Sequence, residues 1–97
     1  MKNPWCVYGV MRDRVGKVVR ESSPKSVYIL YSDGQMYSAE LWDSAYVKRF
    51  RTIIQAIKHN VEHSDIGRHR ILERALSDFP SQKSKIEKLI LLWNIRD

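Results

Sequence analysis

Two histidines and a glutamate in the second half of the chain have a spacing that could bind a metal. His59, Glu62 and His63 fit the pattern H-x-x-E-H, and residues four apart lie on one face of a helix, as zinc ligation requires. On a helical wheel, however, both histidines point away from the apolar stripe of their helix. His69 offers a third ligand, but no fourth is apparent. We therefore expect a solvated helix face here, with no metal and no cofactor.

Other catalytic patterns are missing from the sequence. The glycines, at positions 9, 16, 34 and 67, are scattered and form no phosphate-binding loop, and there is no G-x-S-x-G. The single cysteine, Cys6, lies in an apolar run, which is typical of a small buried hydrophobic residue. Carboxylates stand singly among basic neighbours, so no acid–base pair is indicated. We expect a protein that is not an enzyme.

The basic residues are more informative. The chain has 17 Lys and Arg against 11 Asp and Glu, a formal charge of +6, spread evenly along its length. An excess of this kind favours a nucleic-acid or acidic partner, although it also serves simply to keep a small protein soluble. One group flanks the second predicted strand and another follows the last predicted turn of the β part. A fold that puts the first and last strands side by side would merge the two groups into one phosphate-binding patch. The candidate nucleic-acid-binding residues are Arg12, Arg14, Lys17, Arg20, Lys48, Arg49 and Arg51.

The end of the chain suggests a different kind of contact. The run from Leu89 to Trp93 is apolar around nearly the whole helix, and a small domain cannot easily bury such a helix on all sides. We expect this helix to dock over the rest of the chain or to bind a protein partner. The candidate partner-binding residues are Leu91, Leu92 and Trp93.

These residues must be positioned by two kinds of structure. Strand-like runs cover 5–11, 15–20, 27–32 and 35–41, with a loop at 21–26, and Asp33-Gly34 between the last two runs predicts a hairpin. A two-residue turn would place Tyr31 opposite Met36 and Tyr28 opposite Ala39, leaving apolar residues on both faces. Such a hairpin would be covered on both sides, which assigns its tyrosines to the core rather than to an aromatic ligand cage.

The second half has helical periodicity. Thr52 and Gln55 form a capping box that starts a first helix at Thr52. Ser64-Asp65 predicts the start of a second helix, which Pro80 ends, and Ser81 or Ser84 starts a third. We therefore expect an α+β protein of one domain, with a β part at 1–50 and about three helices at 51–97.

The β part resembles a known small barrel. Val15 to Phe50 gives the order of strands of an SH3-like fold, and Asp43-Ser44-Ala45-Tyr46-Val47-Lys48 is similar to the 3₁₀ turn and last strand of that fold. Tudor-like and KOW-like barrels fit equally well, and a helix capped by Asp43 remains the alternative for this segment. The resemblance implies a small antiparallel β-barrel that serves as a binding fold, and it implies no specific ligand.

Together these features predict a small, basic, cytoplasmic binding module, most simply a nucleic-acid-associated regulatory protein. The alternative is an interaction adaptor or inhibitor that uses the apolar last helix and the barrel edge. An origin in a phage or mobile element would fit either function. No segment approaches the length of a membrane span, so no membrane partner is expected, and a homodimer remains open.

Overall fold

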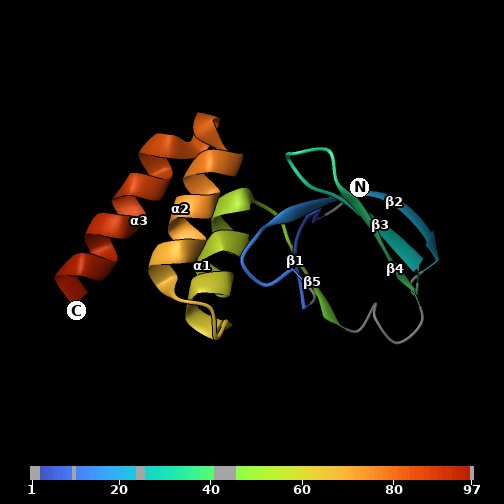
Figure 1. Ribbon diagram of the computed structural model, residues 1–97, viewed down its shortest axis with the longest axis horizontal. Coiled ribbons are helices and arrows are strands. Elements are labelled where there is room, and N and C mark those ends of the chain that lie inside the picture. The colour runs from blue at the N-terminus through green and yellow to red at the C-terminus, as the bar shows by residue number, and fades with distance from the viewer. Residues whose placement is uncertain (1–2, 10, 24–25, 41–45, 97) are drawn as a thin grey trace.

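The computed structural model describes residues 3–9, 11–23, 26–40 and 46–96, with side chains up to residue 93 in the last helix. A five-stranded antiparallel sheet is followed by three α-helices, which confirms the predicted α+β class (Figure 1). The elements are β1 (Trp5–Tyr8), β2 (Gly16–Ser23), β3 (Ser26–Leu30), β4 (Met36–Glu40), β5 (Val47–Phe50), α1 (Ile53–His63), α2 (Arg68–Asp78), the 3₁₀ turn η2 (Pro80–Gln82) and α3 (Lys83–Arg96).

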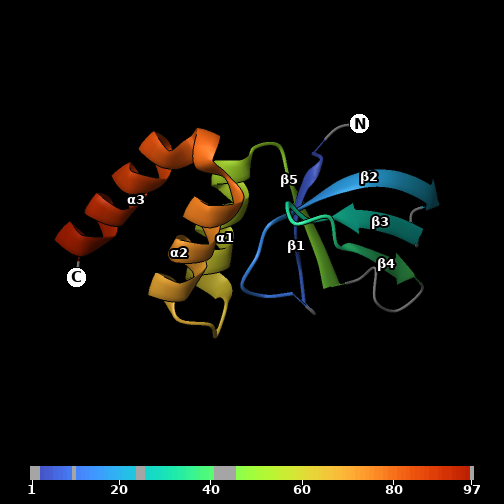
Figure 2. The same ribbon diagram turned by 45° about the horizontal axis from the view of Figure 1, so that its top comes forward.

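The predicted barrel is wrong, because the sheet is not closed. Its strand order is β4-β3-β2-β1-β5, so β4 and β5 lie at opposite edges. The chain passes from the short edge strand β5 directly into α1, which packs on β1 and β5. The helices therefore lie beside this end of the sheet, and the molecule is elongated, with extents of 42 × 25 × 21 Å (Figure 2).

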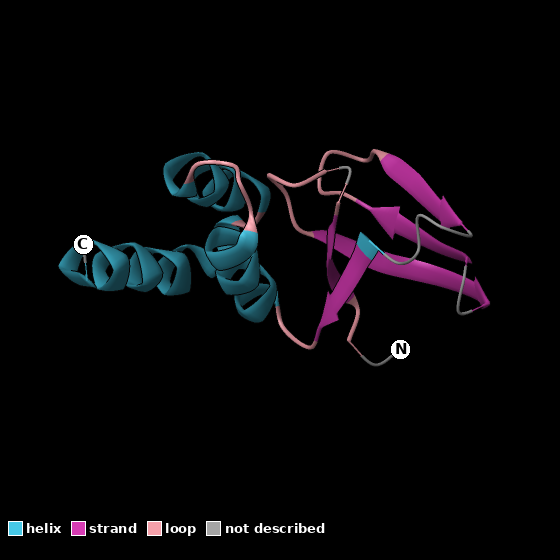
Figure 3. Cartoon of the chain, turned by 90° about the horizontal axis from the view of Figure 1, so that it is seen from below, coloured by secondary structure: helices cyan, strands magenta, loops and turns pink. Residues whose placement is uncertain are grey.

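Strand β1 lies between two hydrophobic cores and contributes side chains to both. Its side chains alternate, so Cys6 and Tyr8 enter a core within the sheet while Trp5 and Val7 pack against the helices. The sheet core also contains Val18, Val27, Ile29, Tyr31 and Ala39. The helical core contains Val15, Ala56, Ile57, Leu72, Ala75, Ile86, Leu89 and Trp93. The β part and the helical part are thus joined through β1, and α3 forms the outermost layer (Figure 3).

The hairpin forms at Asp33-Gly34 as predicted, but its register differs by one residue. Leu30 lies opposite Met36, since only Gly34 of the turn has a positive φ, of 90°. The connection is thus a three-residue loop closed by hydrogen bonds between Tyr31 and both Gly34 and Gln35. The shift puts Met36 on the outer face, where it is 55% exposed. The hairpin is therefore covered on one face only, and its outer face is open.

The other ends of helices and strands agree only in part with those predicted from the sequence. Thr52 caps α1 through the predicted capping box, with both hydrogen bonds to Gln55 present. Ser64 instead follows the end of α1, and α2 begins after Gly67, so the predicted start of the second helix is wrong. β2 extends through Ser23 into the predicted loop. Strand β5 confirms the strand alternative for 47–50, whereas residues 41–45 lie outside the described part of the chain.

Candidate nucleic-acid interface

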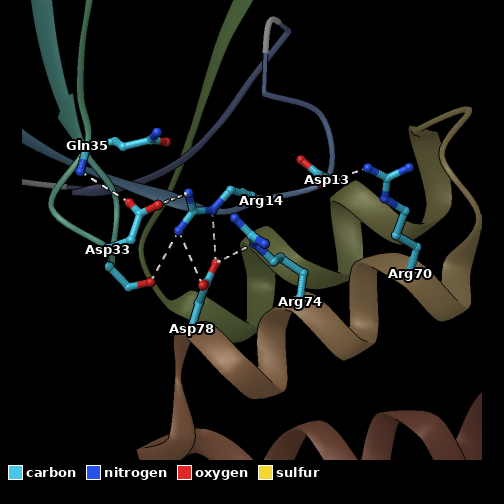
Figure 4. Close-up of polar contacts among 8 residues, drawn as sticks. Asp13, Arg14, Asp33, Gln35, Arg70, Arg74 and Asp78 are labelled. Atoms are coloured by element: carbon cyan, nitrogen blue, oxygen red, sulfur yellow. Dashed lines mark hydrogen bonds and ion pairs between the residues drawn. The ribbon is translucent and has the colours of Figure 1, made fainter.

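The loop between β1 and β2 carries three charged residues that bind the helical part. Each forms an ion pair with a residue of opposite charge in or next to α2 (Figure 4 shows two of the three). The pairs are Arg12 with Asp65 (2.6 Å), Asp13 with Arg70 (3.6 Å) and Arg14 with Asp78 (3.1 Å). Two arginines predicted to bind phosphate therefore attach the sheet to the helices.

Arg14 is the centre of this attachment. It is 2% exposed, and its guanidinium donates to both carboxylate oxygens of Asp78 and to Asp33 in the β3–β4 turn (Figure 4). Burial lowers the pKa of Arg14, but the hydrogen bonds and charges of Asp78 and Asp33 outweigh it and raise that pKa overall. The prediction that Arg14 contacts nucleic acid is wrong, because its donors are occupied inside the protein.

The other predicted basic residues lie on different surfaces. Lys17 and Arg20 are exposed on β2, above the rings of Trp5 and Tyr28, at 5.5 and 5.7 Å from the ring centroids. Arg49 contacts Glu21 at 3.1 Å and donates to the carbonyl oxygen of Asn3. The structure thus brings the predicted residues into several separate sites rather than one patch.

A first groove lies where β5 leads into α1. It has a volume of about 540 Å³ and includes two of the predicted residues, Arg49 and Arg51. Helix α1 forms the other side of the groove. Its lining residues are three or four positions apart and therefore share one face of the helix. The groove is lined by Asn3, Arg49, Phe50, Arg51, Gln55, Lys58, His59 and Glu62.

A second groove of about 580 Å³ shares Arg51 with the first. It lies between the start of α1 and helix α3, which contributes Lys85 and Lys88 from one face. The groove is lined by Trp5, Arg51, Thr52, Ile53, Ile54, Gln82, Lys85 and Lys88. We call the two together the paired grooves.

The paired grooves are strongly cationic. Five basic residues line them against the single carboxylate Glu62. Four of the five are exposed and, among the described residues, have no ion-pair partner: Arg51, Lys58, Lys85 and Lys88. The N-terminus of α1, which has no acidic residue in its first turn, lies between the grooves and adds the positive end of its helix dipole. This surface is suited to binding phosphate groups.

Three lysines of the paired grooves were not predicted from the sequence: Lys58, Lys85 and Lys88. A signal for them was present, because Lys85 and Lys88 are three residues apart in a helix, and Lys58 lies two turns beyond Arg51. That signal shows only which residues share a helix face. The packing of α3 near the start of α1 is what brings Lys85 and Lys88 into the same groove as Arg51.

Of the two histidines of the H-x-x-E-H pattern, His59 lines the first groove and His63 lies next to it. Their rings stack with centroids 4.1 Å apart, and His59 also contacts the ring of Phe50 at 5.0 Å. Partial burial, together with the charges of His63 and Lys48, lowers the pKa of His59. His59 is thus half-buried against the sheet rather than fully solvated, whereas His63 is exposed. The described residues contain no group of three metal-ligating side chains.

The predicted partner-binding residues separate into two groups. Leu91 and Leu92 are 61% and 47% exposed on α3. Trp93 is 5% exposed and belongs to the helical core. The prediction that Trp93 binds a partner is therefore wrong. A helix that looks apolar all round therefore buries one face within the chain and exposes two leucines on another.

Cys6 is buried, as predicted, and burial raises the pKa of its thiol to about 12, which does not suit a nucleophile. No helix in the described ranges is long and apolar enough to cross a membrane. Comparison of the chain with known protein families, curated proteins and solved structures gave no match.

Proposed function

We propose that this protein is a non-enzymatic nucleic-acid-binding module, and that the paired grooves are its binding surface. The observation that carries the proposal is that two adjoining recesses are lined by four cations with no ion-pair partner among the described residues: Arg51, Lys58, Lys85 and Lys88. Phosphate contacts of this kind supply most of the affinity of binding that does not depend on sequence. The regulatory role and cytoplasmic location expected from the sequence are compatible with such a module and form part of the proposal.

Salt dependence tests the proposal directly. Four phosphate contacts give a slope of log K against log salt of about −2.8 for a single strand and about −3.6 for B-form DNA. Affinity for a labelled oligonucleotide, measured by fluorescence anisotropy, should then fall about 50- to 150-fold between 50 and 200 mM salt. Binding that does not change over this range would overturn the proposal.

A matched pair of variants locates the surface. Arg51→Gln with Lys88→Gln removes two charges from the paired grooves and should make the slope shallower by about 1.4 to 1.8. Arg20→Gln with Arg70→Gln removes the same charge from exposed positions on β2 and α2 that line neither groove. If this control pair weakens binding as much as the groove pair, the paired grooves are not the site.

The exposed leucines of α3 support a second candidate function, the binding of a protein partner. Leu91 and Leu92 are adjacent and well exposed, and contiguous exposed apolar side chains are a feature of protein interaction sites. Such an interface would be insensitive to salt and would be lost on Leu92→Asp. A pull-down with and without nuclease separates the two functions, because a protein interface survives nuclease treatment. Sedimentation of the purified chain shows whether that partner is a second copy.

A further inference from the structure

The shape of the paired grooves, together with the rings that line them, indicates which form of nucleic acid they bind. The argument rests on the proposed function. Each groove has the volume of a typical small-molecule site, about 300–1,000 Å³, which is enough for one nucleotide. Reading a duplex instead requires an element that projects into a groove about 12 Å wide. Here the cations line open recesses between the sheet edge and the helices, which leave room for the bases of a strand beside its phosphates.

Each groove is also lined by the half-buried ring of a phenylalanine or a tryptophan. Phe50 lines the first groove and Trp5 lines the second. The two residues lie directly opposite each other on β5 and β1, which places their Cβ atoms about 5 Å apart on the same face of the sheet. Aromatic rings beside cations are the usual platform for the bases of a single strand, whereas the bases of a duplex are already stacked. Lys17 lies over the Trp5 ring and His59 contacts the Phe50 ring, so a base would stack on the part of each ring that these side chains leave open.

Arg51 connects the two recesses, because it lines both. A phosphate bound by Arg51 would have one neighbouring nucleotide on the Phe50 side and the other on the Trp5 side. We infer that the paired grooves bind single-stranded nucleic acid, with the bases of adjacent nucleotides in the two grooves and the linking phosphate at Arg51.

The inference is tested with three probes at one salt concentration: a DNA 12-mer of thymidines, the uridine RNA 12-mer, and a 12-base-pair DNA duplex. Both single strands should bind more tightly than the duplex. If the duplex binds as tightly as the single strands, the inference is wrong while the proposed function stands. If no probe shows salt-dependent binding, the proposed function itself fails.

Removal of one ring gives the sharper test. Phe50→Leu keeps an apolar side chain and should weaken single-strand binding about 5- to 150-fold, and it should weaken duplex binding less. Phe50→Tyr keeps the ring and should bind normally. The matched control is Tyr46→Leu, which removes a 65% exposed ring that lines neither groove. Equal losses in Phe50→Leu and Tyr46→Leu would overturn the inference.

A measurement on the unaltered chain guards against misfolding of the Phe50 variant. Ultraviolet crosslinking to a 5-bromouridine-substituted single strand, followed by peptide mass spectrometry, should attach the strand to the segments that contain Phe50 and Trp5. Crosslinks confined to other segments, such as the outer face of β3 and β4, would contradict the inferred binding mode.

Discussion

Replacing Arg14 with methionine should strongly destabilise the protein. The change keeps a long apolar stem but leaves the carboxylate of Asp78, which is 8% exposed, without its bidentate partner. Asp78 is also the last residue of α2, where the helix dipole disfavours a negative charge. Removing one member of a buried ion pair costs about 3–5 kcal/mol. Since Arg74 still lies 3.7 Å from Asp78, we expect the lower end, about 3 kcal/mol.

That loss is large for a domain of this size, whose total stability is about 5–15 kcal/mol. The midpoint of thermal unfolding should fall by about 12 to 24 °C. Urea denaturation followed by circular dichroism measures the free energy directly. An Arg14→Met variant within about 1 kcal/mol of the parent protein would refute the view that this ion pair holds the sheet and helices together.

A double-mutant cycle separates the two carboxylates that Arg14 contacts. Coupling between Arg14→Met and Asp78→Asn should be about 2 kcal/mol, because the pair is buried and bidentate. Coupling with Asp33→Asn should be smaller, because the Asp33 side chain is 44% exposed and water screens it. Equal or larger coupling with Asp33 would show that the turn, rather than α2, is the main anchor of Arg14.

Three further predictions concern the cores and the first groove. Gly16→Ala should cost about 1–3 kcal/mol in urea denaturation, because the new methyl would lie 2.5 Å from Cγ2 of Ile29. Trp93→Ala should lower the free energy of unfolding by about 3–5 kcal/mol. Leu91→Ala, at an exposed position of the same helix, should change it by less than about 0.5 kcal/mol. Similar losses in the two variants would contradict the buried position of Trp93. The pKa of His59 lies below its ordinary value of 6.5, so the unfolded chain binds more protons there and stability should fall as the pH drops through 6.5. Histidine NMR titration checks that pKa, and in His59→Gln this part of the pH dependence should disappear from the urea midpoints.

Local features of the sequence were sufficient to predict much of the fold. The capping box at Thr52 was predictable because both of its hydrogen bonds join residues three apart. The position of the hairpin was predictable from Asp33-Gly34, but its register was not, since the same dipeptide serves two-residue and three-residue loops. Barrel closure could not be predicted, because it depends on whether the edge strands meet, and no local pattern determines that.

The candidate site, like the fold, was predictable from the sequence only in part. The residue patterns and the charge of the sequence by itself determined that this is a small α+β protein with an excess of basic residues. Only the tertiary structure decided which cations are available. Arg14 is neutralised by Asp78, 64 residues further along the chain. Lys88 lies beside Arg51 because α3 packs near the start of α1. Electrostatic partners are chosen by distance in space, and for residues so far apart in sequence that distance is determined by packing.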